Sequence, residues 1–119
     1  MVAESARHSS AYVPERGDLV WLNFDPQSGH EQAGKRPALV ISPQTYNAKV
    51  GLALLCPITS RVKGYPFEVT LSANGKIKGV ILSDQIKNLD WRAREAKFAE
   101  KASPSVLSET LRKLRSLIG

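Results

Sequence analysis

Apolar and polar positions alternate along most of the chain in short runs that end at Gly, Pro or an Asn-Gly pair. This pattern is typical of β-strands joined by turns. Asn74-Gly75 predicts a hairpin turn, residues 44–49 predict a helical turn or short helix, and residues 94–101 fit either a last strand or an irregular basic segment. The predicted strands cover residues 18–24, 37–43, 51–58, 67–71, 79–82 and 85–89.

The C-terminal segment has a longer period and predicts one amphipathic helix. Ser103 is a suitable N-cap, and Pro104 suits the first helical position. Strands followed by this helix predict a mainly β fold, an antiparallel barrel or twisted sheet with the helix packed on it. The apolar positions of the helix are Leu107, Leu111, Leu114 and Ile118. The basic residues near its end, predicted to be solvated and to complement the helix dipole, are Arg112, Lys113 and Arg115.

Length and composition limit the possibilities further. At 119 residues and 13.0 kDa the chain fits a single domain, which we place at residues 12–119 after a polar, flexible tail at residues 1–11. No apolar run approaches the roughly 20 residues that span a bilayer, which excludes a membrane helix. Because the N-terminus also lacks the apolar core of a secretory signal, a cytoplasmic protein is predicted.

Cys56 is the only cysteine, so no internal disulfide can form. Its apolar neighbours Leu54 and Ile58 favour a small buried side chain over a catalytic thiol. The two histidines, His8 and His30, have no spacing that resembles a zinc site. We therefore expect no metal and no cofactor, and any phosphate chemistry should be metal-independent.

Charge is distributed unevenly along the chain. The net charge is +6, but residues 1–40 carry −1 and residues 41–119 carry +7. A field of this kind favours a polyanionic partner, either a nucleic acid or an acidic protein segment. The alternative is a surface with a charge surplus that binds nothing anionic.

The segment at residues 29–37 brings a carboxylate and two cations between two glycines and a proline. RNA can be cleaved without metal if its own 2′-OH attacks the adjacent phosphate, which requires a base, an acid and donors for the developing charge. Glu31 could serve as base, Arg36 could clamp the phosphate, and Lys35 could add charge or donate a proton. An exposed loop with an incidental ion pair would have the same sequence.

A second candidate region follows the predicted strand at residues 51–58. The hydroxyl of Thr59 could donate to a phosphate oxygen, although a turn-forming role explains it as well. Residues 61–67 interleave cations with aromatic rings, as single-strand binders do, and Tyr65 is the better candidate for stacking on a base. Trp91, beside two arginines, could stack on a base, but burial against the sheet or at a dimer contact is the more common fate of such a side chain. The predicted substrate contacts are His30, Gln32, Lys35, Ser60, Arg61, Lys63, Tyr65 and Gln85.

These motifs in this order resemble the MazF/PemK family of toxin endoribonucleases, over about residues 12–119. The motifs that carry the resemblance are Gly17-Asp18, Phe24-Asp25-Pro26, Gly29-x-Glu31-x-x-Gly34-x-Arg36-Pro37, Pro57-x-Thr59, residues 63–69, Asp84-Gln85 and Trp91-Arg-Ala-Arg94.

The resemblance implies an SH3-like barrel with a C-terminal helix, a homodimer, and an enzyme that cuts single-stranded RNA at a short sequence without metal. The expected products are a 2′,3′-cyclic phosphate and a 5′-hydroxyl. It also implies a MazE-like antitoxin whose disordered acidic tail lies in a basic groove. In the family, residues matching Arg36 and Thr59 are regarded as the catalytic pair, and a carboxylate matching Glu31 is needed in MazF-like members.

Physical chemistry assigns the roles differently. Because the pKa of arginine exceeds about 12, it is a poor base, so Glu31 is favoured for deprotonation and Arg36 for charge stabilisation or protonation of the leaving group. Some members have histidine where this chain has Lys35. Two other functions keep the same fold: a non-catalytic RNA-binding module, and a CcdB-like toxin that inhibits gyrase.

Overall fold

The computed structural model describes residues 11–24 and 34–119. The expected tail therefore lies almost wholly outside the described residues, and so does the segment 25–33. None of the described helices is long and apolar enough to cross a membrane. The elements are β1 (Asp18–Asn23), β2 (Lys35–Val40), α3 (Gln44–Val50), β3 (Leu52–Thr59), β4 (Glu68–Thr70), β5 (Val80–Leu82), β6 (Lys87–Asp90), β7 (Lys97–Lys101) and α4 (Pro104–Ile118).

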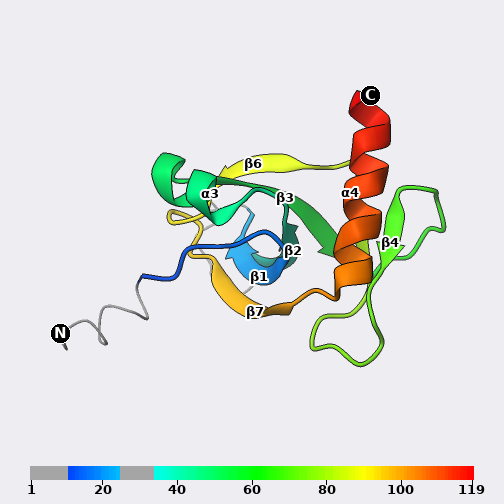
Figure 1. Ribbon diagram of the computed structural model, residues 1–119. Helices are drawn as coiled ribbons and strands as arrows, with labels where there is room; N and C mark the ends of the chain where they lie inside the picture. The colour runs from blue at the N-terminus through cyan, green and yellow to red at the C-terminus, as the bar shows by residue number, and fades with distance from the viewer. Residues whose placement is uncertain (1–10, 25–33) are drawn as a thin grey trace.

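The strands described here form one antiparallel sheet in the order β4-β5-β3-β2-β1-β7, with β6 also paired to β3. Strand β3 has β2 along one edge, while β6 and then β5 follow each other along the opposite edge. Figure 1 shows β4 beside α4, and α3 at the far end of β3. The sheet is strongly twisted but open, so of the two forms predicted, the twisted sheet is confirmed and the closed barrel is wrong.

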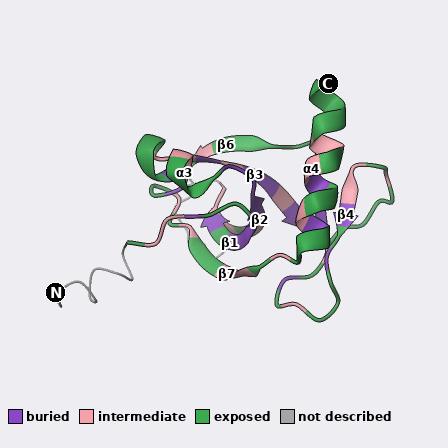
Figure 2. Cartoon of the chain, in the orientation of Figure 1, coloured by how far each residue is buried: buried purple, intermediate pink, exposed green. Residues whose placement is uncertain are grey.

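The core has one layer on each face of the sheet, because successive side chains of a strand point to opposite faces. Leu19 belongs to the cluster covered by α4, whereas its neighbour Val20 belongs to the cluster that contains Trp91. Burial on both faces makes β1, β2 and β3 the most enclosed strands (Figure 2). The predicted core positions Cys56 and Trp91 are both buried.

Helix α4 forms as its sequence predicts. The hydroxyl of Ser103 accepts a hydrogen bond from the Val106 N–H at 3.3 Å, and Pro104 is the first helical residue. Leu107, Leu111 and Leu114 pack against the sheet. The capped amphipathic helix is therefore confirmed, except at its last turn, where the predicted apolar position Ile118 is 84% exposed.

A buried carboxylate ties the start of β1 to its neighbours. Asp18 accepts hydrogen bonds from the Tyr12 hydroxyl at 2.6 Å and the Glu15 N–H at 3.0 Å, and its other oxygen lies 2.7 Å from the Lys101 ammonium on β7. Burial and the contact with Asp18 raise the pKa of Tyr12 above its ordinary value. The pair with Asp18 also raises the pKa of Lys101.

Strand β2 differs from its prediction. It begins at Lys35 rather than Pro37, and it ends at Val40 rather than Pro43. Pro37 pairs with Trp21 inside the strand. The ladder between β2 and β3 starts only at Ala38. Proline has no N–H, but Pro37 therefore costs no hydrogen bond to β3. Lys35 and Arg36 therefore lie on a strand and not in the loop to which they were assigned.

The hairpin between β4 and β5 also differs, because its turn is not the tight Asn-Gly type. Thr70 pairs with Val80, and residues 71–79 form a longer connection. Gly75 lacks the positive φ of a tight hairpin turn, whereas Gly79 has φ +116°. Ile77 is 3% exposed and belongs to the core, so its burial folds this connection back over the sheet.

Two ambiguous segments are resolved. Residues 97–101 form β7, which pairs with β1, so the strand reading of 94–101 holds for its second half. The short helix expected at residues 44–49 is α3, one residue longer.

Gly79 provides a test of the packing around β3. A Cβ atom at this position would overlap the carbonyl oxygen of Thr59. We expect Gly79→Ala to lower the free energy of unfolding by about 3 kcal/mol or more, because the backbone strain of about 1–3 kcal/mol adds to the steric overlap. Urea denaturation measures this loss.

Gly51→Ala is the matched control. Gly51 also has a positive φ, +81°, but a Cβ there would meet nothing within 4 Å. We expect a loss of about 1–2 kcal/mol from backbone strain alone. Equal losses in the two variants would contradict the close approach of Gly79 to Thr59.

Candidate functional site

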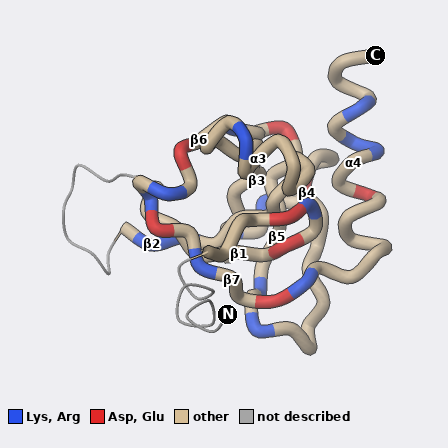
Figure 3. Tube along the Cα trace, turned by 60° about the vertical axis from the view of Figure 1, so that its left-hand side comes forward, with Lys and Arg blue, Asp and Glu red and all other residues tan. Residues whose placement is uncertain are grey.

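A pocket of about 410 Å³ opens where β1, β2 and β3 meet the 71–79 connection. The described residues that line it include five cations and no Asp or Glu. Figure 3 shows basic positions at the beginning of β2, on β7 and in the loops. A cluster of cations with no carboxylate in the described lining attracts anions. Its cations are Lys35, Arg36, Arg61, Lys76 and Lys78.

The antiparallel register brings Arg36 and Thr59 to the same pocket. The β2–β3 ladder pairs Ala38 with Pro57. Arg36 and Thr59 each lie two residues beyond this same end of the ladder. Arg36 is exposed, and both residues line the pocket. A guanidinium and a hydroxyl from neighbouring strands therefore line one pocket.

Thr59 serves the local turn without losing its capacity to donate. Its hydroxyl oxygen accepts a hydrogen bond from the Arg61 N–H at 3.1 Å. The turn-forming interpretation is thus confirmed, but a hydroxyl that accepts one bond still carries a proton to donate. Ser60 is exposed beside it and lines the same pocket. The Lys35 ammonium lies 3.9 Å from the exposed carboxylate of Glu95.

The 61–67 loop forms a separate group of contacts. The Glu68 carboxylate accepts hydrogen bonds from the N–H groups of Lys63 and Gly64 at 2.9 and 2.8 Å. The Tyr65 hydroxyl donates to Asp84 at 2.7 Å, a bond that raises the pKa of Tyr65 above its ordinary value. These contacts order the loop and leave the tyrosine ring partly exposed.

Lys113 corrects a prediction. Instead of being solvated, its ammonium donates to the carbonyl oxygens of Pro66 and Glu68, the latter at 3.1 Å. A long side chain on α4 can reach carbonyl groups that a short loop leaves unpaired. Helix α4 therefore holds the loop that carries Tyr65.

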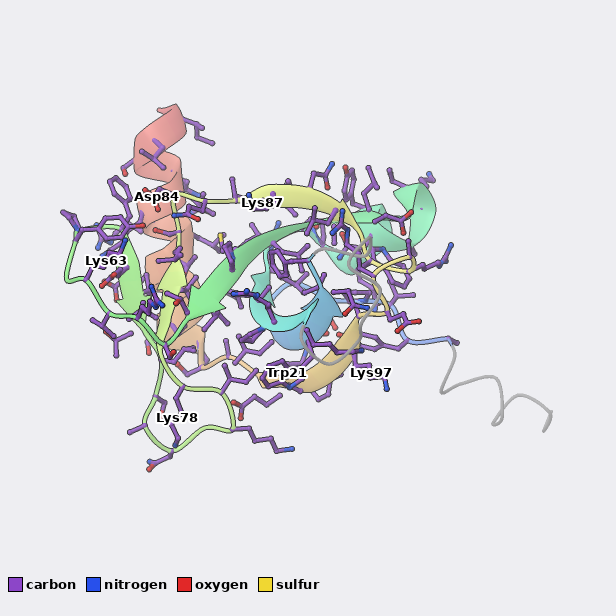
Figure 4. The ribbon with its side chains drawn as sticks, turned by 180° about the vertical axis from the view of Figure 1, so that it is seen from behind. Trp21, Lys63, Lys78, Asp84, Lys87 and Lys97 are labelled. Atoms are coloured by element: carbon purple, nitrogen blue, oxygen red, sulfur yellow. The ribbon has the colours of Figure 1, made fainter. Side chains whose placement is uncertain are left out.

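The structure divides the predicted site residues into three groups. Those that line the pocket are Lys35, Arg36, Thr59, Ser60 and Arg61. Those outside its lining are Lys63, Tyr65 and Gln85. Those that lie outside the described residues are His30, Glu31 and Gln32. In Figure 4, Lys63 and Asp84 lie together on one side, apart from Trp21.

Three aromatic or charged residues of the lining, Trp21, Lys76 and Lys78, were not predicted. Trp21 is 39% exposed because it alternates with the buried Val20 and Leu22 along β1, a signal that the sequence does contain. Lys76 and Lys78 reach the pocket because β5 pairs with β3, and no local pattern indicates that pairing. Trp91, by contrast, is 5% exposed and donates from its indole N–H to the Asn47 carbonyl, which confirms its burial.

No group of three metal-binding side chains occurs within residues 11–24 and 34–119. The thiol of Cys56 is buried and donates to the Ser83 carbonyl. Burial raises the pKa of Cys56 to about 12. This thiol is therefore neutral at physiological pH and belongs to the core.

Comparisons with known proteins agree with this architecture. A family profile described as "PemK-like, MazF-like toxin of type II toxin-antitoxin system" matches residues 15–118. The endoribonuclease toxin MazF of Escherichia coli (strain K12) is 50% identical over 110 residues, which cover 92% of this chain and 98% of that protein. The endoribonuclease toxin ChpB of the same organism is 42% identical over 111 residues, with coverage of 87% and 93%.

Solved structures give the same result. MazF (Form-I) from Deinococcus radiodurans matches with a TM-score of 0.82 and 57% identity, covering 91% of this chain and 98% of that chain. The MazE-MazF structure (Form-II) from the same organism matches with a TM-score of 0.82 and 52% identity, covering 91% and 97%. An open twisted sheet with a C-terminal helix is thus the fold of a known toxin class. The chain belongs to the family of PemK-like, MazF-like toxins of type II toxin-antitoxin systems.

The state of Cys56 can be tested directly. Because its pKa is raised from 9.0 to about 12, the reactive thiolate is scarce below that pH in the folded protein, and burial blocks access as well. We expect a thiol reagent at pH 8 to leave the native protein unlabelled and to label it once urea unfolds the chain. Mass spectrometry reads the adduct, and rapid native labelling would contradict the burial.

Proposed function

We propose that this chain is the toxin of a type II toxin-antitoxin pair and acts as a metal-independent endoribonuclease on single-stranded RNA. The relatives named endoribonuclease match nearly the entire chain. The observation that carries the proposal is the meeting of Arg36 and Thr59, from adjacent strands, in a pocket without a described acidic side chain. Cleavage of messenger RNA would inhibit translation and growth.

The proposed reaction is an internal transesterification. The 2′-oxygen of a ribose attacks the adjacent phosphorus, the bond from phosphorus to the 5′-oxygen breaks, and the products are a 2′,3′-cyclic phosphate and a 5′-hydroxyl. Glu31 takes the proton from the 2′-OH. The Arg36 guanidinium stabilises the charge that develops on the phosphate oxygens, the leaving 5′-oxygen takes its proton from Arg36 or Lys35, and the Thr59 hydroxyl donates a hydrogen bond.

The remaining predicted contacts divide by place. Lys35, Ser60 and Arg61 line the pocket and are proposed to hold the backbone at the scissile step. Tyr65 and Gln85 lie outside the pocket lining. The Tyr65 hydroxyl is bonded to Asp84, and Gln85 is the next residue in the chain. Both are proposed to contact bases that are splayed out of the RNA strand. His30, Gln32 and Lys63 are further proposed substrate contacts. Such contacts would make cleavage specific for a short sequence.

The proposed setting of this activity follows the family. The protein is a cytoplasmic homodimer whose domain spans residues 12–119 after a tail at 1–11. Its antitoxin is MazE-like, and an acidic, disordered segment of that partner would occupy the cationic pocket in place of RNA. The MazE-MazF structures from Deinococcus radiodurans support a partner of this kind.

Arg36→Ala tests the catalytic assignment. We expect the rate of cleavage of a long single-stranded RNA in EDTA to fall about 100- to 1,000-fold, the usual loss when one charge-stabilising donor is removed. Sequencing the 5′ ends of the products measures activity and specificity together. Arg112→Ala is the control, because Arg112 is highly exposed on α4 and pairs only weakly with Glu109, at 3.8 Å.

Full activity of the Arg36→Ala variant would contradict the catalytic role of Arg36. Intact RNA with the parent protein would instead favour the non-catalytic binding module. Slowed DNA supercoiling without RNA cleavage would favour a gyrase inhibitor.

Thr59→Val and Thr59→Ser separate the hydroxyl from the shape of the side chain. Valine keeps the volume but can neither donate to the phosphate nor accept from the Arg61 N–H, so we expect cleavage to fall about tenfold or more, as for a lost hydrogen bond of about 1–2 kcal/mol. Serine keeps the hydroxyl and should stay within a few-fold of the parent rate. Thermal melts establish that both variants fold, and equal activity of the two would contradict a donor role.

A further inference from the structure

The connection between β4 and β5, residues 71–79, stands directly beside Thr59. The first residue after it, Val80, pairs with Thr59. The last residue within it, Gly79, lies so close to the Thr59 carbonyl that no side chain fits between them. The Leu71 N–H also donates to the Gly79 carbonyl at 3.0 Å, which closes the base of the connection. We call this segment the basic loop, because it carries Lys76 and Lys78.

Glu100 on β7 holds the tip of the basic loop. One of its carboxylate oxygens accepts hydrogen bonds from the N–H groups of Lys76 at 2.8 Å and Ile77 at 3.1 Å. A Cβ atom on Gly75 would lie only 2.8 Å from the same oxygen, so glycine allows the approach. The burial of Ile77 anchors the loop a second time.

Lys78 closes the loop from within. Its ammonium donates to the carbonyl oxygens of Ala73 at 2.8 Å and Gly75 at 3.4 Å. Lys76 has a different position, since its side chain is exposed while its backbone is bound to Glu100. Both residues line the pocket that contains Arg36 and Thr59. In Figure 4, Lys78 and Trp21 lie along the same edge of the molecule.

A solvated lysine on a mobile loop would need no explanation. Here, however, the backbone of the loop is fixed by a carboxylate, and none of the ion pairs among the described residues involves Lys76 or Lys78. A charge on a fixed backbone is cheaper to bind, because less conformational freedom is lost when the ligand arrives. The arrangement therefore fixes the backbone from which the exposed Lys76 side chain extends at the pocket.

We propose that the basic loop is a second phosphate-binding wall of the site. Lys76 contacts a backbone phosphate of RNA that flanks the scissile one, and Lys78 keeps the loop closed. Glu100 is a positioning residue that holds Lys76 through the backbone and does not touch RNA. This inference rests on the proposed ribonuclease function, and it adds a set of contacts that neither the sequence motifs nor the catalytic residues include.

The salt dependence of binding tests the contact. The probe is a short, randomised 2′-O-methyl RNA, which cannot be cleaved because its 2′-oxygen is blocked. Each phosphate contact contributes about −0.7 to the slope of log K against log salt concentration for a single strand. We expect Lys76→Gln to weaken binding and to make the slope shallower by about 0.7.

Lys49→Gln is the matched control, because Lys49 is an exposed lysine on α3 and does not line the pocket. It should leave the slope unchanged. An unchanged slope in Lys76→Gln, or an equal change in both variants, would overturn the proposed contact.

A double-mutant cycle tests the role of Glu100. Glu100→Ala should raise KM for RNA cleavage about as much as Lys76→Gln does, with little change in kcat, and Glu100→Gln should restore part of the loss because its carbonyl oxygen still accepts. In the Glu100→Ala background, Lys76→Gln should have little further effect, since the lysine is already misplaced. Additive effects of the two changes, or no rescue by glutamine, would overturn the positioning role.

The two proposals fail in different ways. If the parent protein cuts RNA but Lys76→Gln binds with an unchanged slope, only the second wall is wrong. If the parent protein leaves RNA intact while Lys76→Gln reduces the slope, the ribonuclease function is wrong and the phosphate contact stands.

Discussion

Strand β3 imposes the constraint on which the site depends. It is paired along both edges, with β2 on one side and with β6 and β5 in succession on the other. Because β3 is also enclosed on both faces, a shift by one residue would exchange its buried layers. The register is therefore fixed, and with it the position of Thr59 at the strand end, where it pairs with Val80 of β5.

Carboxylates have an unusual task in this basic protein. Glu68, Glu100 and Asp18 each accept hydrogen bonds from backbone N–H groups of a neighbouring segment. Bound in this way, they order the loops and the entry to β1. In the described lining of the pocket, all the charged residues are cations. Carboxylates, which could cancel the positive field, thus hold in place the segments that carry the cations. Figure 3 shows positive and negative residues alternating along β7.

Much of this arrangement could be predicted from the sequence, for local reasons. Alternation and turn residues locate the strands, and the capped period of α4 locates the helix, because both signals depend on near neighbours. Arg36, Thr59 and Arg61 were found through motifs next to strand ends, and the pocket brings them together. Cys56 was assigned to the core from its apolar neighbours, and burial was expected for Trp91 because large aromatic side chains are usually buried; both residues are buried.

What could not be predicted depends on pairing between distant segments. The reach of Lys113 to the 61–67 loop and the place of Lys76 beside Thr59 both follow from tertiary contacts. Pro37 was taken as a strand boundary because proline usually interrupts a ladder, but here the ladder to β3 begins after it.

The two tryptophans occupy opposite environments, and this gives the protein a built-in optical reporter. Trp21 stands partly exposed on the wall of the cationic pocket, while Trp91 is enclosed in the core with its indole N–H bonded to a carbonyl. An occupant of the pocket would change or quench the emission of the first and leave that of the second untouched. Fluorescence can therefore distinguish filling of the pocket from loss of the fold without any added dye.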